Sequence, residues 1–231
     1  MQRNRTAIRV LALAVGLLAA AGALAKDIKI AHVYDKTGAL EAYAKQTQTG
    51  LMMGLEYATG GTMTVNGNKL VVIEKDDQGK PDVGKSLLAT AYGDDKADLA
   101  VGPTSSGVAL AMLPVAEEYK KILLVEPAVA DSITGEKWNK YIFRTGRSSS
   151  QDALANAVAS DVPGLSIAVL AQDYAFGRDG VKAFKDGGHD GVVAFGGGSG
   201  LAPVVSIARG WAKSDKLKGR EATFDHGALA S

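Results

Sequence analysis

Two adjacent serines, Ser105 and Ser106, stand where small hydroxyl groups could bind an anion. They follow a short apolar run at residues 99–101 that breaks at Gly102 and Pro103, and they precede a segment with apolar residues at helical spacing. This pattern predicts a strand, a polar turn and a helix of a parallel sheet. Because unpaired N–H groups at a helix start attract negative charge, the turn predicts a binding site for a small acid. Helix capping by a serine hydroxyl is the alternative, and the two roles are compatible.

The possible metal ligands of this sequence are its histidines and a pair of acids. His32, His189 and His226 show no metal-ligand spacing. Asp76 and Asp77 lie at a predicted strand end and could hold a cation, but we expect them to form a solvated turn. The sequence therefore predicts no metal site.

The glycine-rich run at residues 196–200 superficially suggests a dinucleotide-binding loop, because it follows an apolar run. Leu201 stands where the last glycine of that motif belongs, so the required spacing is absent. The sequence also lacks the nucleophile turn of hydrolases, the His-Glu-x-x-His zinc motif and the phosphate-binding loop. We expect a binding protein that uses no cofactor, and a small α/β enzyme is the alternative.

The amino-terminal segment is typical of a secretory signal peptide. Three arginines precede an uncharged apolar run at residues 10–23, and Ala23-Leu24-Ala25 has the small-x-small pattern of a cleavage site. We expect residues 1–25 to be removed after Ala25; an uncleaved anchor or a buried helix is the alternative. With 0 cysteines, the chain has neither disulfides nor a cysteine for a lipid anchor. A soluble protein in the periplasm is the expectation.

Charge is almost balanced, with 26 basic and 25 acidic residues and a formal net charge of +1. Nucleic-acid-binding proteins carry a basic surface that neutralises phosphates. This composition has no such excess, so we expect no nucleic-acid partner.

Apolar runs and helical segments alternate along the chain after residue 26. This alternation predicts an α/β protein with two doubly wound parallel-sheet lobes and a ligand cleft between them. A polar segment at residues 145–150 is the expected linker. We predict a first lobe at 26–146, the start of a second lobe at 147–187, and an atypical glycine-rich tail at 188–231. We expect this tail to reflect a truncated or frame-shifted reading, and a naturally short protein is the alternative.

An ordered set of short motifs resembles one protein family. The motifs are DIKIA at 27–31, KDDQ at 75–78, GPTSSG at 102–107, EPAVA at 126–130 and DYAFG at 173–177. In this order, behind an export signal, they resemble the periplasmic leucine/isoleucine/valine-binding proteins, the solute receptors of ABC importers. The resemblance implies a type I periplasmic-binding fold and a monomer that delivers a small ligand to an inner-membrane permease. A ligand-sensing receptor lobe of the same fold is the alternative.

The resemblance also implies residues that would contact the ligand in the first lobe. It puts Ser105 and Ser106 on the ligand carboxylate and Ala128 and Ala130 in the next cleft loop. Ala130 stands where the amino-acid binders usually have a threonine, and the segment 126–131 resembles relatives that bind aromatic acids. An aliphatic amino acid and an aromatic carboxylic acid both remain open as ligands.

Aromatic side chains complete the site that the resemblance implies. Tyr43 falls where an aromatic wall of the cleft is expected, although it could be an ordinary helix-face tyrosine. Tyr174 and Phe176 lie in the first loop of the second lobe and could close over an apolar ligand body, or belong to the core instead. We expect the family's longer chains to complete the second lobe, and this chain as written to bind ligand weakly or not at all, with a poorly ordered segment after residue 187.

Overall fold

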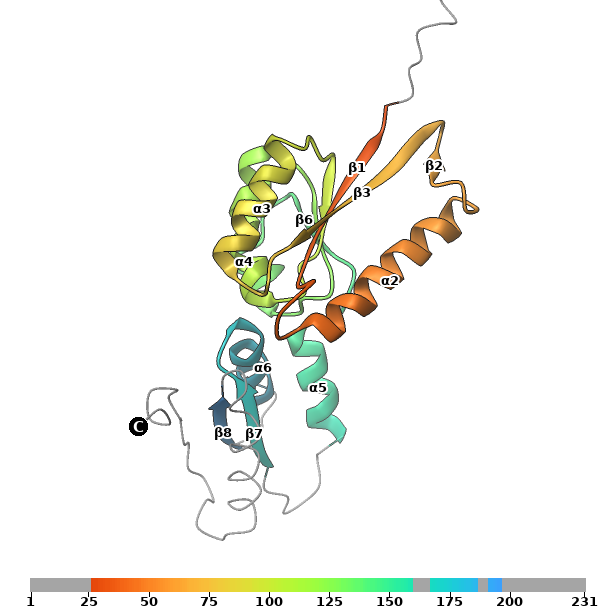
Figure 1. Cartoon of the computed structure of the whole chain (residues 1–231). Coiled ribbons are helices and arrows are strands. Elements are labelled where there is room, and N and C mark those ends of the chain that lie inside the picture. The colour runs from red at the N-terminus through yellow and green to blue at the C-terminus, as the bar shows by residue number, and fades with distance from the viewer. Residues whose placement is uncertain (1–25, 160–166, 187–190, 197–231) are drawn as a thin grey trace, which may run out of the picture.

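The computed structural model describes residues 26–159, 167–186 and 191–196 (Figure 1). The signal segment 1–25 and most of the segment after residue 187 therefore lie outside the described residues. Six strands form one sheet in the order β2-β3-β1-β4-β5-β6. They are β1 (Ile28–Tyr34), β2 (Thr64–Val65), β3 (Asn68–Asp76), β4 (Leu99–Val101), β5 (Leu123–Val125) and β6 (Ile142–Arg144). All neighbouring pairs are parallel except the hairpin β2-β3, as the alternating pattern predicts.

Helices cover both faces of this sheet (Figure 1). On one face lie α3 (Pro81–Gly93) and α4 (Ser106–Tyr119), and on the other lies α2 (Glu41–Ala58). The main hydrophobic core is on the α3–α4 side, and its fully buried side chains come from the helices and from the sheet. Ala31, Val33, Leu88, Met112 and Leu123 are among them.

The opposite face is packed less tightly. Ala44 is the residue that α2 buries completely within the described structure, while Met53 and Tyr57 are 63% and 91% exposed. A cavity of about 510 Å³ lies between α2 and the sheet, lined on the helix side by residues such as Tyr43 and Leu51. The helical spacing of the sequence predicts α2 correctly, but its apolar residues do not form a continuous buried stripe.

A second, smaller unit follows the sheet. It contains α5 (Ser149–Ala159), β7 (Ile167–Gln172), α6 (Ala175–Asp186) and β8 (Gly191–Gly196), and the two strands pair in parallel. Ala153 and Phe184 form its small core. The strand β8 lies inside the segment that the sequence analysis assigned to an atypical tail, so the strand–helix alternation continues beyond residue 187. In the described residues no helix is long and apolar enough to cross a membrane.

Candidate functional site

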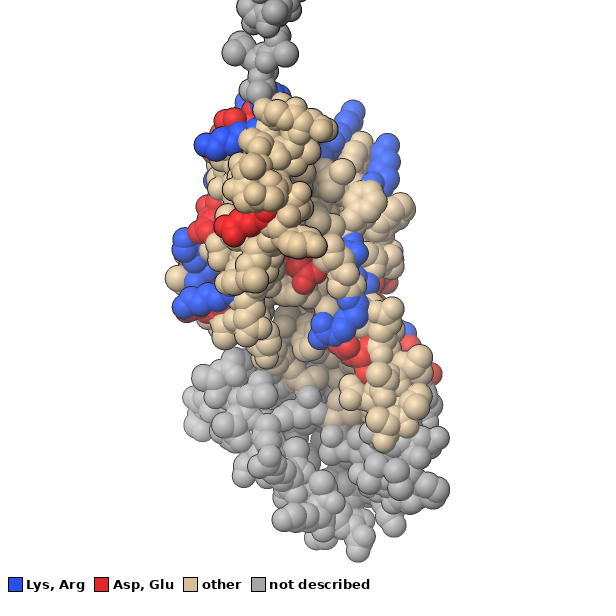
Figure 2. All heavy atoms as spheres, turned by 90° about the vertical axis from the view of Figure 1, so that its right-hand side faces the viewer, with Lys and Arg blue, Asp and Glu red and all other residues tan. Residues whose placement is uncertain are grey.

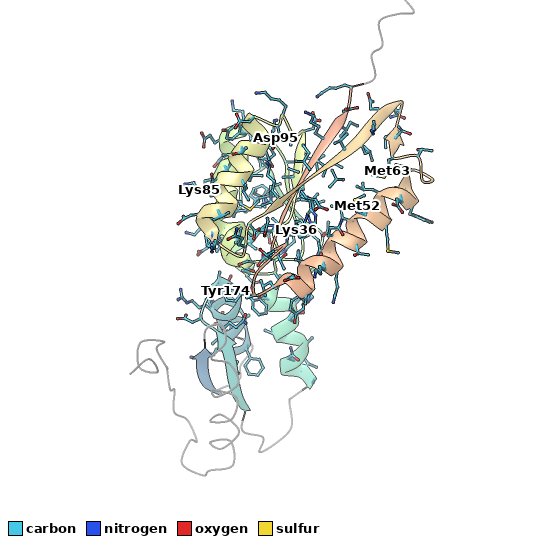
Figure 3. The ribbon with its side chains drawn as sticks, viewed as in Figure 1. Lys36, Met52, Met63, Lys85, Asp95 and Tyr174 are labelled. Atoms are coloured by element: carbon cyan, nitrogen blue, oxygen red, sulfur yellow. The ribbon has the colours of Figure 1, made fainter. Side chains whose placement is uncertain are left out.

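The carboxyl ends of three neighbouring strands bring polar residues together. Because β3, β1 and β4 are adjacent and parallel, their chains leave the sheet at the same edge. Asp77 follows β3, Asp35 follows β1, and Ser105 follows β4 by a short turn. Ligands of open parallel sheets bind at this edge. Figure 3 shows the same region, with Tyr174 of the smaller unit directly beside it.

Ser105 and Ser106 are buried at the start of α4, with 7% and 2% of their surfaces exposed. Ser105 is the N-cap residue, but in the described structure its side chain makes no capping hydrogen bond. Ser106 Oγ accepts a hydrogen bond from the Ala130 N–H at 3.2 Å. The Ser106 hydroxyl proton can therefore donate to a ligand anion beside the N–H groups of the helix start.

The loop after β5 lies against these serines. Ala128 and Ala130 are buried, and the short 3-10 helix η1 (Asp131–Ile133) follows them. Arg144 on β6 donates from Nη1 to the Ala130 carbonyl oxygen at 2.8 Å. Hydrogen bonds on both sides of Ala130 hold its backbone next to the start of α4, where the sequence analysis placed a cleft loop.

Tyr174 joins the same region from the smaller unit. Its ring atom Cδ2 lies 4.0 Å from the point where a Cβ on Gly107 would be, and Ser105 Oγ lies 3.7 Å from that point. Burial raises the pKa of Tyr174, and the negative charge of Asp35 and the neighbouring Tyr43 raise it further. The structure thus brings Tyr174 to the serine turn.

The other two aromatic candidates are more exposed than Tyr174. The rings of Phe176 and Tyr174 are 5.9 Å apart and tilted by 39°. Phe176 is 37% exposed and Tyr43 is 63% exposed. Tyr43 lines the cavity under α2, on the sheet face opposite α4, and its contact with a ligand stays a prediction.

The solvated turn expected at Asp76 and Asp77 is wrong for Asp77, which has 0% of its surface exposed. The Gly79 N–H donates to Asp77 Oδ1 at 2.8 Å, and burial raises the pKa of Asp77 to about 7. Asp76 takes the outward position, accepting from the Thr37 N–H and hydroxyl at 3.1 and 2.6 Å. In adjacent residues after a strand, one side chain points inward and the next outward, and the sequence does not show which.

Asp35 is a second buried acid that the sequence analysis missed. It has 0% of its surface exposed, and burial raises its pKa. Its position directly after the apolar run of β1 was the available signal, because a residue at that point lies at the ligand edge of the sheet. Among the residues that the structure describes, no group of three or more His, Cys, Asp or Glu could hold a metal ion.

Contacts between the two units lie beside this edge. Asp179 Oδ2 on α6 accepts from the Ser132 N–H at 3.1 Å and from the Ser132 hydroxyl at 2.9 Å. Ser150 Oγ donates to Asp131 Oδ2 at 2.6 Å. The expected linker at 145–150 thus ends within α5, which begins at Ser149. Figure 2 shows the molecule from the side of α2, where most of the described surface is neither acidic nor basic and the blue and red side chains lie scattered.

A family of periplasmic binding proteins matches residues 27–200 of this chain, which is most of its length. The chain belongs to this family. A Leu/Ile/Val-binding protein of Rhizobium johnstonii is 29% identical over 186 residues, which are 79% of this chain and 48% of that protein. The chain therefore spans about half the length of the curated relatives it matches.

Two solved structures from Rhodopseudomonas palustris show the same fold. An ABC-type branched-chain amino acid transporter protein of strain CGA009 is 52% identical, with a TM-score of 0.65 over 85% of this chain and 62% of that one. A solute-binding protein of strain BisB5, solved with 3,4-dihydroxybenzoic acid, is 27% identical, with a TM-score of 0.71 over 86% and 54%. The predicted α/β type I periplasmic-binding fold is confirmed, and the chain represents part of it.

Proposed function

We propose that this periplasmic binding protein captures a small carboxylic acid or amino acid for an ABC importer and delivers it to an inner-membrane permease. The observation that carries the proposal is the turn before α4, where the buried Ser105 and Ser106 stand beside Tyr174. N–H groups and a free hydroxyl proton at a helix start bind a carboxylate without catalysing its reaction. Members of this family are solute-binding proteins, and this agrees with such a site.

The ligand we propose combines a carboxylate with an apolar body. The solved relatives include a branched-chain amino acid transporter protein and a protein with a bound dihydroxybenzoic acid. The Tyr174 and Phe176 rings, 5.9 Å apart, would cover that body. Ala130 in the cleft loop carries no hydroxyl group, so a branched aliphatic amino acid and an aromatic acid both remain candidates.

Further parts of the proposal concern the state of the protein. We infer export to the periplasm with cleavage after Ala25, a monomeric receptor, a first lobe at residues 26–146 and a second lobe that starts at residue 147. The periplasmic family supports export, and the end of the six-stranded sheet at Arg144 supports the first boundary.

Thermal shift tests the proposal directly, because a ligand that binds only the folded state raises the melting temperature with its concentration. Benzoate, 3,4-dihydroxybenzoate, L-leucine and L-valine are the probes, and D-glucose is the control without a carboxylate. We expect glucose to leave the melting temperature unchanged and at least one acid to raise it, although only at high concentration, because the chain as written should bind weakly. The proposal would be contradicted if none of the four acids raised the melting temperature, or if the protein converted one of them to product.

Two serine variants separate binding from folding. Ser105→Ala removes a hydroxyl without a capping bond in the described structure, so we expect weaker acid binding at unchanged stability. Ser106→Ala also leaves the buried Ala130 N–H without its acceptor, so we expect weaker binding and a loss of about 1–3 kcal/mol in the free energy of unfolding. Calorimetric titration and urea unfolding measure the two effects. Unchanged acid affinity in both variants would show that these serines have a structural role and do not bind the ligand.

A further inference from the structure

Asp35 and Asp77 are two buried acids that meet at one glycine. They follow β1 and β3, which pair in parallel with Tyr34 opposite Asp76. The Gly79 N–H lies 2.8 Å from Asp77 Oδ1, and Asp35 Oδ2 lies 2.7 Å from the point where a Cβ on Gly79 would be. Both side chains have 0% of their surface exposed. The loop after β3 thus folds so that its glycine allows the two carboxyl groups to approach each other.

These carboxyl groups are poorly supplied with hydrogen-bond donors. Within the described structure, both oxygens of Asp35 and the Oδ2 atom of Asp77 accept no hydrogen bond. Ionised carboxylates can only accept hydrogen bonds, so neither acid can donate a hydrogen bond to the other while both are charged. A buried anion without donors is costly, whereas one proton converts a carboxylate into a donor for its neighbour.

The pKa values of both acids are consistent with a shared proton. Burial raises the pKa of Asp77 to about 7, and the Gly79 N–H only partly offsets this, while the charge of Asp35 adds to it. Burial also raises the pKa of Asp35, although the interaction with the neighbouring Asp77 side chain lowers it. When two carboxyl groups interact at one site, their apparent pKa values separate. One group then loses its proton at low pH, and the other keeps its proton to higher pH.

The charged neighbours do not neutralise the pair. Asp76 adds a third negative charge from β3 and raises the pKa of both acids. Lys36 Nζ is 2.6 Å from Glu74 Oε2. Lys80 Nζ, before α3, is 2.9 Å from Gln78 Oε1. On the side of α6 lies Tyr174, whose hydroxyl is neutral near pH 7 and whose pKa is raised further by burial.

A second buried polar atom lies at the same edge, on the loop that carries the serines. Thr104 is 8% exposed, and its Oγ1 atom has no hydrogen-bond partner in the part of the chain that the structure describes. Thr104 precedes Ser105, and the Ser105 backbone N–H lies near enough to Asp35 to lower its pKa. The acid pair therefore lies next to the turn at which the ligand carboxylate is proposed to bind.

We propose that Asp35 and Asp77 share one proton across the ends of β1 and β3, and that binding of a carboxylate at the Ser105–Ser106 turn draws this proton from solvent onto the pair. The coupling rests on the proposed function, whereas the shared proton exists without ligand. A bound anion adds negative charge next to the pair and so favours its protonated form. By linkage, the protonated pair favours the anion.

The proton balance is simple and sets the direction of the pH effect. A doubly ionised pair takes one proton from water or buffer as the carboxylate binds, and the same proton returns to solvent on release. Affinity for an acid should therefore increase as the pH falls from 8 to 6, by at most about tenfold per pH unit for one proton. Benzoate remains ionised over this range, so its own titration does not produce the effect.

The ligand-free measurement is a carbon-13 NMR titration of aspartate-labelled full chain. We expect one of the two buried carboxyls to titrate near pH 7 in the parent. In Asp77→Asn, the new amide donates to Asp35 in place of the shared proton, so the titration near pH 7 should disappear. Asp35→Asn is the second variant if the first does not fold, and exposed Asp94→Asn is the control that should leave this titration unchanged. Ordinary titration of both acids near pH 4 would overturn the proposal.

The ligand measurement is calorimetric titration of benzoate and L-leucine at pH 7 in phosphate and in Tris, whose protonation enthalpies differ. We expect a fraction of one proton to be taken up per acid bound by the parent and by Asp94→Asn, and none by Asp77→Asn. Binding with no proton uptake in the parent would refute the coupling while leaving the proposed function intact. Absence of binding at every pH would refute the coupling and the proposed function together, and the NMR titration would still decide the shared proton by itself.

Discussion

At the scale of the residue, the central strand β1 carries polar side chains where apolar ones would be expected. His32 has 0% of its surface exposed, and neither ring nitrogen finds a hydrogen-bond partner among the described residues. Its ring stacks on Tyr34 with centroids 4.1 Å apart. Burial lowers the pKa of His32 to about 4, although the nearby Glu74 acts in the opposite direction. The imidazole is therefore held neutral inside the sheet.

His32 should make the protein acid-sensitive. In the unfolded chain the pKa of His32 has its ordinary value of 6.5, whereas in the folded chain it is about 4. The free energy of unfolding should therefore be unaffected by His32 above about pH 6.5 and should fall as the pH drops toward 4, by up to about 3 kcal/mol. Urea unfolding at several pH values measures this loss.

His32→Phe is the matched variant, because it retains an aromatic ring for Tyr34 and removes the titrating group. We expect the variant to lose less stability than the parent between pH 6.5 and pH 4. It should also be more stable at pH 7, since it removes two buried polar atoms without partners. Parallel pH profiles for the two proteins would show that His32 is not the titrating group.

At the scale of the element, the turn between β4 and α4 depends on one glycine. Gly102 has φ +116°, and a Cβ at this position would lie 1.9 Å from the Val33 carbonyl oxygen. Its N–H donates to the Leu124 carbonyl oxygen at 3.1 Å. The backbone of β1 thus passes so close to the turn that a side chain has no room. This approach places the serines that follow at the edge of the sheet.

Gly102→Ala should therefore destabilise the fold by more than the usual overpacking cost of about 1–3 kcal/mol, because the backbone conformation is also unfavourable for alanine. Gly50→Ala is the control, since a Cβ at Gly50 in α2 meets nothing within 4 Å. There we expect a gain of about 0.5–1 kcal/mol from helix propensity. Chemical unfolding of both variants checks the contrast, and a Gly102→Ala protein as stable as the parent would show that the turn can move.

At the scale of the whole molecule, the six-stranded sheet is complete before the chain reaches α5. Its last strand ends at Arg144, and the core on the α3–α4 side comes almost entirely from residues before this point. The smaller unit is joined to it by the hydrogen bonds between Ser132 and Asp179 and by Ala175, which packs against the main core. Among the described residues, the first unit therefore contains most of the buried apolar side chains.

A segment of residues 26–146 should fold by itself. We expect a cooperative thermal transition and the circular dichroism of an α/β protein, because the main core is intact. Its acid affinity should be lower than that of the full chain, since Tyr174 is missing from the site. A segment that remains unfolded would show that the smaller unit is required for stability, and the boundary at residue 146 would then be wrong.

Much of the fold could be predicted from periodicity and turn residues. The alternation of apolar runs and helical segments predicts the order of elements and the parallel sheet, and Asn66-Gly67 predicts the hairpin between β2 and β3. The strand β8 was missed, because a short apolar run among glycines has no periodicity of its own. For the candidate site, Ser105 and Ser106 could be found from their place between a strand and a helix.

The sequence by itself determined the class of fold, the family and the serine turn, because all three can be recognised from the local spacing of residues and from the order of short motifs. Only the tertiary structure decided that Asp35 and Asp77 are buried together and that His32 is held neutral. Burial and pairing depend on which strands become neighbours, and residues 35 and 77 are joined by contacts between distant segments. Local sequence patterns do not predict those contacts, so the charge state of the site is set only when the sheet is assembled.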